Sequence, residues 1–171
     1  GEKANWEKFA LWDQTTRVPL FIRAPGVAGE GTRTRAPATL TDLYPTLCEL
    51  AGLPVPAQCD GLSLVPQLRD PAALRARPAL TAHVFRGEPG PSQAVADERY
   101  RFIRYGNGFE ELYDLRRDPD EFDNRAADPA LAGERARLAA FLAPRPAASV
   151  GIPAGSVHSL RPAGKAKKQA R

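Results

Sequence analysis

The chain has 171 residues, 43% of them hydrophobic and 26% charged, and a formal net charge of +4. These values lie near the average for globular proteins, and no apolar stretch approaches the roughly 20 residues that span a bilayer, so composition argues against a membrane-spanning protein. Two cysteines, Cys48 and Cys59, are too few for a disulfide framework and are not spaced as a redox pair or a zinc site.

The first part of the chain reads as a loop followed by one buried strand. Residues 1–17 mix Trp and charged residues without strand alternation, which indicates a loop that runs into a short helix. Residues 18–22 form a continuous apolar run of strand length, typical of a strand covered on both faces. Residues 26–38 are rich in Gly, Thr and Arg and predict an exposed loop. The chain contains no Met and opens at Gly1, which favours a partial chain.

A helix is predicted next. Thr39 or Thr41 can cap its start, and Gly52 stops it. Its apolar stripe consists of Leu40, Leu43, Leu47 and Leu50. Pro45 is acceptable in the first turn, where its missing N–H has no helical partner. A short helical turn is expected over residues 64–68.

The pattern then changes to strands separated by turn residues. The expected strands are residues 79–85, 94–96, 100–105 and 111–115. Gly106-Asn107-Gly108 marks a tight turn between the last two. The sequence therefore predicts a small antiparallel meander.

A second helix and a tail complete the pattern. Asp128 and Pro129 are a capping side chain and a first-turn proline, and they precede an apolar stripe of Leu131, Leu138, Phe141 and Leu142. Residues 144–171 have few large apolar groups and carry much of the net positive charge, so we expect a disordered basic tail. Without interleaved aromatic residues, a solvating tail is favoured over a nucleic-acid-binding one.

Two lysines and one histidine are candidate substrate-binding residues. Lys3 and Lys8 lie on the loop before the buried strand, where an ammonium group would give an anion three donors and a full charge. A solvated lysine is the alternative. His83 lies in a strand pattern, which favours a structural or binding role over catalysis. The acidic residues near Pro119 fit turn formation better than calcium binding.

Several segments, in matching order, resemble type I sulfatases of the iduronate-sulfatase-like group, in the alkaline-phosphatase superfamily. The matching residues are Gly1-Glu2-Lys3, Trp6-x-Lys8, Thr16-Arg17-Val18-Pro19-Leu20, Leu40-Thr41-Asp42-Leu43-Tyr44-Pro45-Thr46-Leu47, Asp60-Gly61-Leu62-Ser63-Leu64, Glu98-Arg99-Tyr100-Arg101-Phe102-Ile103 and Glu111-Leu112-Tyr113-Asp114-Leu115. The resemblance implies an α/β fold. Residues 1–70 would be the C-terminal end of a sulfatase α/β domain, with the buried strand and a helix. Residues 71–143 would be a small antiparallel sheet packed with a C-terminal helix, and residues 144–171 the tail.

The resemblance also implies a chemistry. Such enzymes hydrolyse sulfate esters with a formylglycine nucleophile and a calcium ion, and the lysine of the Trp-x-Lys motif, here Lys8, contacts the sulfate. Neither Cys48 nor Cys59 fits the motif that is converted to formylglycine, and the family's metal pair would precede Gly1. Ala96 stands where related sequences often have an arginine. We therefore expect a sulfatase fragment, without a cofactor of its own, that binds a sulfate ester only with the missing N-terminal half.

Two alternatives remain open. A phosphonate or phosphodiester hydrolase of the same superfamily would share the metal, the nucleophile and a lysine at this place. The second alternative is a non-catalytic module, in which the meander and the basic tail bind an acidic polymer.

Overall fold

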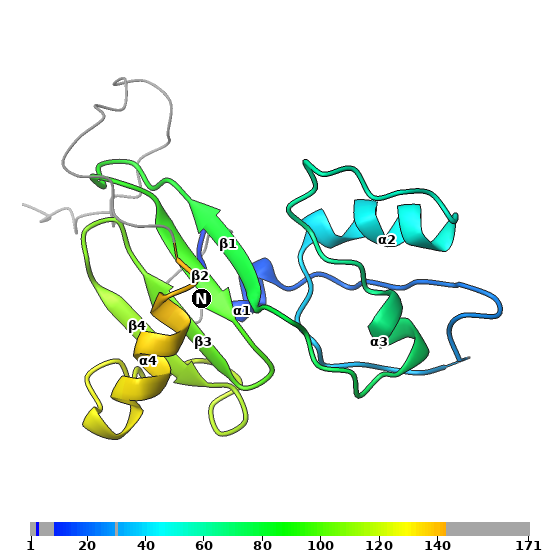
Figure 1. The fold of residues 1–171 in the computed structure, drawn as a ribbon. Helices are drawn as coiled ribbons and strands as arrows, with labels where there is room; N and C mark the ends of the chain where they lie inside the picture. Colours follow the sequence, from blue (N-terminus) through cyan, green and yellow to red (C-terminus); the bar gives the residue numbers. More distant parts are fainter. Residues whose placement is uncertain (1–2, 4–8, 30, 143–171) are drawn as a thin grey trace, which may run out of the picture.

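The computed structural model describes residues 3, 9–29 and 31–142, which form one antiparallel sheet and several short helices (Figure 1). The helices are α1 (Asp13–Thr16), α2 (Leu43–Leu50), α3 (Val65–Arg69) and α4 (Ala132–Ala139), with 3-10 turns η2 (Leu40–Asp42) and η3 (Pro129–Leu131). The strands are β1 (Ala79–His83), β2 (Ser92–Ala96), β3 (Tyr100–Arg104) and β4 (Glu110–Asp114). No described helix is long and apolar enough to cross a membrane.

The sheet is the predicted meander, with its strands in the order β1-β2-β3-β4 and every pair antiparallel. The predicted turn closes the last hairpin, where Gly108 has a φ of +94° and the N–H of Tyr105 donates to the carbonyl of Phe109 at 2.9 Å. Glycine is suited to this position because side chains crowd the backbone at positive φ. The local turn signal was therefore sufficient to predict the pairing.

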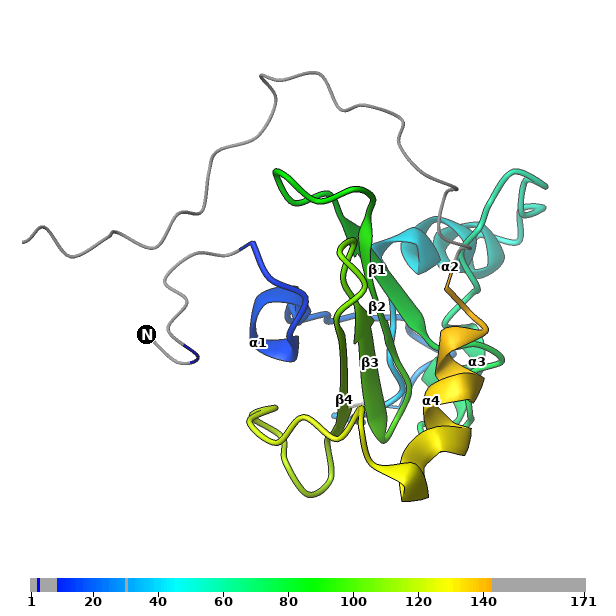
Figure 2. The same ribbon diagram turned by 90° about the vertical axis from the view of Figure 1, so that its left-hand side faces the viewer.

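Both faces of the sheet are covered (Figure 2). On one face Leu138 of α4 and Leu142, just after it, pack in one core with Phe102, as the predicted stripe requires, whereas Phe141 of that stripe is 40% exposed. On the other face the segment that leads into α1 packs through Leu11 against Ile103. Alternate residues of β3 thus lie in two separate cores, which follows from the two-residue period of a strand.

Helices α2 and α3, with the chain between them, form a unit that we call the α2–α3 unit. Hydrogen bonds join the start of α2 to the segment before α3. Thr39 and Asp42 form a reciprocal capping box at the start of η2. Asp42 Oδ1 also accepts from the backbone N–H of Leu62 at 2.7 Å, and Thr46 Oγ1 accepts from that of Leu64 at 2.8 Å. The two motif segments that begin at Leu40 and Asp60 are therefore parts of one hydrogen-bonded unit.

Gly61 lies where these segments meet, and we expect Gly61→Ala to destabilise the fold by about 2–3 kcal/mol through overpacking. A Cβ on Gly61 would lie 2.0 Å from the carbonyl oxygen of Thr41, which belongs to rigid backbone. Gly133→Ala is the matched control, because a Cβ there meets nothing within 4 Å and alanine stabilises a helix by about 0.5–1 kcal/mol relative to glycine. Urea unfolding measures both changes, and equal stabilities of the two variants would contradict the steric argument.

The predicted buried strand at residues 18–22 is wrong for this structure. The segment forms no strand, and Phe21 is 91% exposed. An apolar run shows that a segment is suited to burial but not what covers it, and no strand pairs with these residues within the described part of the chain.

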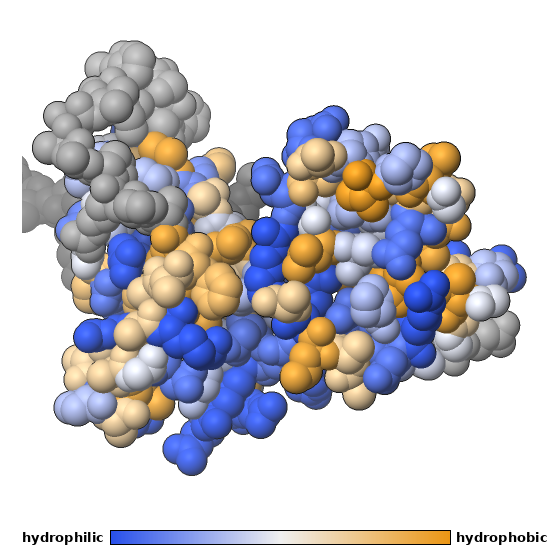
Figure 3. All heavy atoms as spheres, in the orientation of Figure 1, coloured by the Kyte–Doolittle hydropathy of each residue, from blue (hydrophilic) through white to orange (hydrophobic). Residues whose placement is uncertain are grey.

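The helix over residues 43–50 is confirmed, but part of its expected apolar stripe faces outward. Leu40 and Leu47 are 73% and 63% exposed, whereas Pro45, Thr46 and Cys48 form the buried face. The hydrogen bonds of Asp42 and Thr46 fix the rotation of the helix, so Leu47 stays at the surface while Leu43 and Leu50 are half-buried. Apolar side chains accordingly show on the α2–α3 side of the molecule (Figure 3).

Cys48 and Cys59 are free thiols in the structure. The predicted basic tail lies outside the described residues, and the boundaries of the predicted domains at residues 70 and 143 stay predictions.

Candidate functional site

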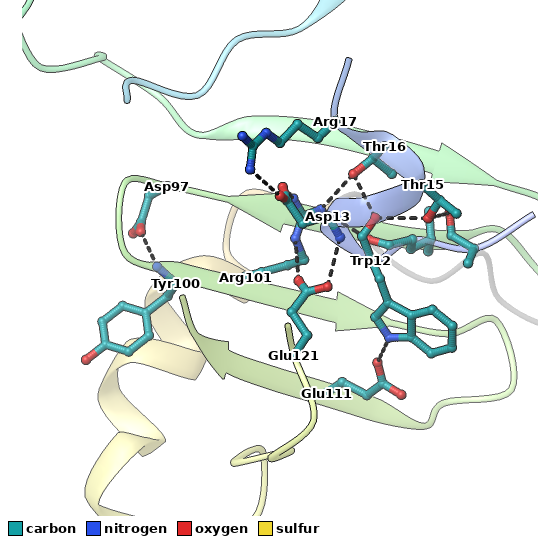
Figure 4. Close-up of polar contacts among 12 residues, drawn as sticks. Trp12, Asp13, Thr15, Thr16, Arg17, Asp97, Tyr100, Arg101, Glu111 and Glu121 are labelled. Carbon is teal, nitrogen blue, oxygen red and sulfur yellow. Dashed lines mark hydrogen bonds and ion pairs between the residues drawn. The ribbon is translucent and has the colours of Figure 1, made fainter. Parts of the chain in front are cut away.

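Residues 9–16 cross the sheet face opposite α4 and are fixed to it by buried contacts. Leu11 is 1% exposed in the core that it shares with Tyr113. The indole Nε1 of Trp12 donates to Glu111 Oε2 at 2.9 Å, across 99 positions of sequence (Figure 4). This segment directly follows the predicted anion-binding residue Lys8.

Arg101, on β3, holds the same segment through several groups. Its Nη1 donates to the carbonyl of Leu11 at 3.1 Å and to Thr16 Oγ1 at 3.2 Å, and its Nη2 donates to Asp13 Oδ1 at 2.7 Å. Its Nε lies 2.8 Å from Glu121 Oε1, an ion pair without the angles of a hydrogen bond. Glu121 Oε2 accepts from the backbone N–H of Asp13 at 2.8 Å. We call Asp13, Arg101 and Glu121 the clamp.

Two members of the clamp are buried, and the third, Asp13, has a side chain that is 24% exposed. The side chains of Arg101 and Glu121 are 7% and 1% exposed. Burial raises the pKa of Glu121, while the Arg101 charge and the N–H of Asp13 oppose that rise. A buried charge pair is strongly coupled, so losing one partner leaves an uncompensated charge. The clamp therefore suits positioning of the segment rather than proton transfer.

The phenols near the clamp are neutral at ordinary pH. Burial, with the nearby Glu111 carboxylate, raises the pKa of both Tyr105 and Tyr113. Tyr105 Oη donates to Glu111 Oε2 at 3.2 Å. Glu111 is thus shared between this phenol and the indole of Trp12, and both rings are held in place.

Lys3 occupies an aromatic cage. Its Nζ lies 4.5 Å from the ring centroid of Trp12, 4.6 Å from that of Tyr113 and 5.8 Å from that of Phe122. Nζ is buried without a hydrogen-bond partner, and burial lowers the pKa of Lys3 against the opposing charge of Glu121. Cation–π attraction compensates part of the lost hydration. The predicted sulfate contact of Lys3 stays a prediction.

Lys8 lies outside the described residues, but the residue after it contacts His83. The ring of Phe9 stacks on His83 with centroids 5.4 Å apart and planes 24° apart. His83 in turn meets the edge of Phe85 at 4.5 Å. The structure therefore brings His83, at the end of β1, next to Phe9, the residue that follows Lys8 in the sequence.

No group of three or more His, Cys, Asp or Glu side chains suited to a metal ion occurs among the described residues. Among the acidic residues near Pro119, Asp118 shapes a turn, as predicted: its Oδ2 accepts from the N–H of Asp123 at 2.7 Å. Glu121 instead belongs to the clamp. Arg99 donates to Asp114 and holds the pKa of that carboxyl below its usual range. The described residues do not fit a calcium site, and Cys48 precedes Glu49 in a sequence that does not fit the nucleophile motif.

Comparison with known proteins gives the family. Residues 1–144 match the family model described as N-sulphoglucosamine sulphohydrolase, C-terminal. The chain belongs to this family. It is a sulfatase C-terminal region with a small four-stranded antiparallel sheet and short helices.

The sulfatase C-terminal region has relatives with different activities. A sulfatase of Formosa agariphila is 37% identical over 126 residues, covering 74% of this chain and 24% of the relative. The choline-sulfatase of Rhizobium meliloti is 33% identical over 144 residues, covering 82% and 27%. The solved structure of the phosphonate monoester hydrolase of Silicibacter pomeroyi aligns with a TM-score of 0.54 and 28% identity, covering 69% of this chain and 26% of that one. The chain thus spans about a quarter of the length of the curated relatives it matches.

Sequence reasoning missed the side chains that position the segment of this sulfatase region. Arg101 was visible only as a charge between Tyr100 and Phe102 in an apolar strand, which is a signal that a buried partner exists. Glu121 was interpreted only as one of the acidic residues near Pro119 that form turns. Nothing in the neighbouring sequence distinguishes it, because its partners lie on β3 and at the start of α1.

Proposed function

We propose that this chain is the C-terminal region of a sulfuric ester hydrolase, a type I sulfatase of the iduronate-sulfatase-like group, in which Lys8 binds the sulfate. The fixed segment 9–16 carries this proposal. Phe9 stacks on His83, and Leu11 is buried. Phe9, which directly follows Lys8 in the sequence, is thereby held against β1. A positioned ammonium group neutralises charge on a sulfate oxygen or on the leaving oxygen.

The remaining parts of the reaction would come from the rest of a longer polypeptide. We expect that part to supply the formylglycine nucleophile and the calcium ion, and the 171-residue chain alone to be inactive. The exposure of Phe21, at 91%, and of Leu47, at 63%, supports packing of this region against further layers of an α/β domain.

Lys8→Ala is the direct test, made in the longest polypeptide that the gene encodes. Loss of one positioned charge at the transition state is expected to lower kcat/KM for an aryl sulfate by about 10²–10³-fold. Arg117→Ala is the control, because the Arg117 side chain is 78% exposed and its ion pair with Asp114 is long, at 4.0 Å. Unchanged turnover by Lys8→Ala would refute the assignment, as would calcium-dependent hydrolysis of aryl sulfate by the 171-residue chain alone.

A phosphonate or phosphodiester hydrolase is the second candidate, favoured by the 28% identity and TM-score of 0.54 to the phosphonate monoester hydrolase. The ratio of kcat/KM for 4-nitrophenyl sulfate to that for a 4-nitrophenyl phosphonate monoester separates the two. We expect the sulfate to be preferred, and a strong preference for the phosphonate would replace the sulfatase proposal.

A further inference from the structure

Three aromatic rings surround the ammonium group of Lys3, and we call them the Lys3 cage. Nζ of Lys3 lies 4.5 Å from the ring centroid of Trp12, 4.6 Å from that of Tyr113 and 5.8 Å from that of Phe122. The rings come from the segment before α1, from β4 and from the turn after β4. A ring face attracts a cation that lies within about 6 Å of its centroid. The fold thus assembles a site for one positive charge from distant parts of the chain.

Two walls of the cage are fixed and the third is at the surface. Tyr113 is 4% exposed and belongs to the core on the sheet face opposite α4. The indole of Trp12 is held by its hydrogen bond to Glu111 (Figure 4). Phe122, by contrast, is 63% exposed. The cage therefore exists independently of Lys3 on its inner side and borders solvent on its outer side.

The cage offers negative charge but no hydrogen-bond acceptor. The carboxylates of Glu121, Glu111 and Asp118 all favour a cation at Nζ of Lys3. Their oxygens have other partners, since Glu121 Oε2 accepts from the N–H of Asp13, Glu111 Oε2 from the indole, and Asp118 Oδ2 from a backbone N–H in its own turn. Nζ itself is buried without a hydrogen-bond partner. A cation that needs no acceptor would fit this site best.

Lys3 occupies the cage at a cost. A primary ammonium carries three N–H donors, and burying them unpaired is unfavourable. Burial accordingly lowers the pKa of Lys3, although the nearby carboxylates oppose that shift. The backbone of Lys3 also has a φ of +54°, in the left-handed region that residues with side chains rarely adopt. Release of Lys3 would restore the hydration of its ammonium group and relax its backbone.

We propose that the Lys3 cage is a binding site for a quaternary ammonium group, and that Lys3 fills it when no ligand is bound. A quaternary ammonium carries the full positive charge but has alkyl groups in place of N–H donors, so it loses no hydrogen bonds to water when it enters the cage. Lys3 is then an internal competitor that the ligand displaces. The inference is independent of the proposed sulfatase function, because the three rings take no part in that chemistry.

Ligand-observed nuclear magnetic resonance with three small probes tests the cage. Tetramethylammonium, methylammonium and tert-butanol are added separately, at constant ionic strength, to the longest polypeptide that the gene encodes, and saturation transfer to their methyl protons gives each dissociation constant. We expect tetramethylammonium to bind at least about fivefold more tightly than either of the others. Equal binding of tert-butanol would indicate a merely apolar pocket, and equal binding of methylammonium a site for any cation. Either result would overturn the proposal.

Variants locate the binding. Lys3→Ala is expected to bind tetramethylammonium about tenfold more tightly, because a competitor lowers the apparent affinity by the fraction of time that the site is empty. Phe122→Ala removes the exposed wall, leaves the core intact and should weaken binding about fivefold. Phe109→Ala is the matched control, because Phe109 is similarly exposed, at 57%, and lies outside the cage. Unchanged affinity of Phe122→Ala, or no saturable binding by Lys3→Ala, would refute the cage as the site.

The same chemical group occurs on soluble compounds and on lipid headgroups, and a vesicle assay separates these sources. Wild type and Phe122→Ala are sedimented with phosphatidylcholine vesicles. Cosedimentation of wild type that Phe122→Ala abolishes would support the cage with a membrane headgroup as its ligand. Tetramethylammonium binding without cosedimentation would support it with a soluble ligand.

Discussion

Arg101→Met is expected to lower the free energy of unfolding by about 3–5 kcal/mol, the usual cost of removing one partner from a buried ion pair. Methionine keeps much of the apolar volume of the arginine, so the loss reports the charge and its hydrogen bonds. Glu121, with its side chain 1% exposed, would be left as an uncompensated carboxylate, and the carbonyl of Leu11 would lose its donor. Urea unfolding followed by Trp fluorescence measures the effect directly beside Trp12.

Two further variants identify the cause of that loss. Arg101→Met combined with Glu121→Gln removes the unpaired charge and should recover part of the stability. Arg117→Ala should change stability little, because water screens a side chain that is 78% exposed. A double variant no more stable than Arg101→Met would show that packing, and not the stranded carboxylate, accounts for the loss.

The sheet and its helix could be predicted from sequence because their signals are local. The Gly106-Asn107-Gly108 turn specifies one hairpin, and the Asp128 cap with its following proline specifies the start of η3 and α4. Burial partners are a different matter. Residues 18–22 show the composition of a covered strand, but composition carries no information about which strands would cover it. The outward rotation of α2 likewise depends on hydrogen bonds from Leu62 and Leu64.

The clamp could not be predicted because its members are far apart in sequence. Asp13 bonds to Glu121 across 108 positions and to Arg101 across 88. No periodicity or motif relates charges at such separations, and a charged residue in a turn is ordinarily solvated. The sequence did identify the segment that the clamp holds, because Lys8 and the apolar residues after it resemble a known motif. Motif recognition thus located the candidate site, and only the three-dimensional contacts explain how it is fixed.

Replacement of Asp42, like that of Arg101, is expected to lower the free energy of unfolding strongly. Its carboxylate accepts from the N–H groups of Thr39 and Leu62 and from Arg75 Nη2, at 2.8, 2.7 and 2.7 Å. The side chains of Asp42 and Arg75 are 2% and 5% exposed, so Asp42→Asn would leave the guanidinium buried without its counter-charge. We expect Asp42→Asn to lower the free energy of unfolding by about 3–5 kcal/mol at pH 7. Asp70→Asn, at an exposed turn of the same unit, is the control and should change little.

The pH dependence of this loss gives an independent test. Burial alone would raise the pKa of Asp42, but the N–H groups of Thr39 and Leu62 and the charge of Arg75 outweigh it, so the folded pKa lies below the usual value. The folded state then binds the proton less tightly than the unfolded state, whose Asp pKa is about 3.9. The stabilisation by the carboxylate is therefore complete above about pH 5 and disappears as the pH falls through 4 toward the folded pKa. The stability gap between wild type and Asp42→Asn, measured by urea unfolding at pH 7, 5 and 3, should hold between pH 7 and 5 and narrow at pH 3. A gap that stays constant down to pH 3 would mean that the Asp42 side chain contributes through its shape and not through its charge.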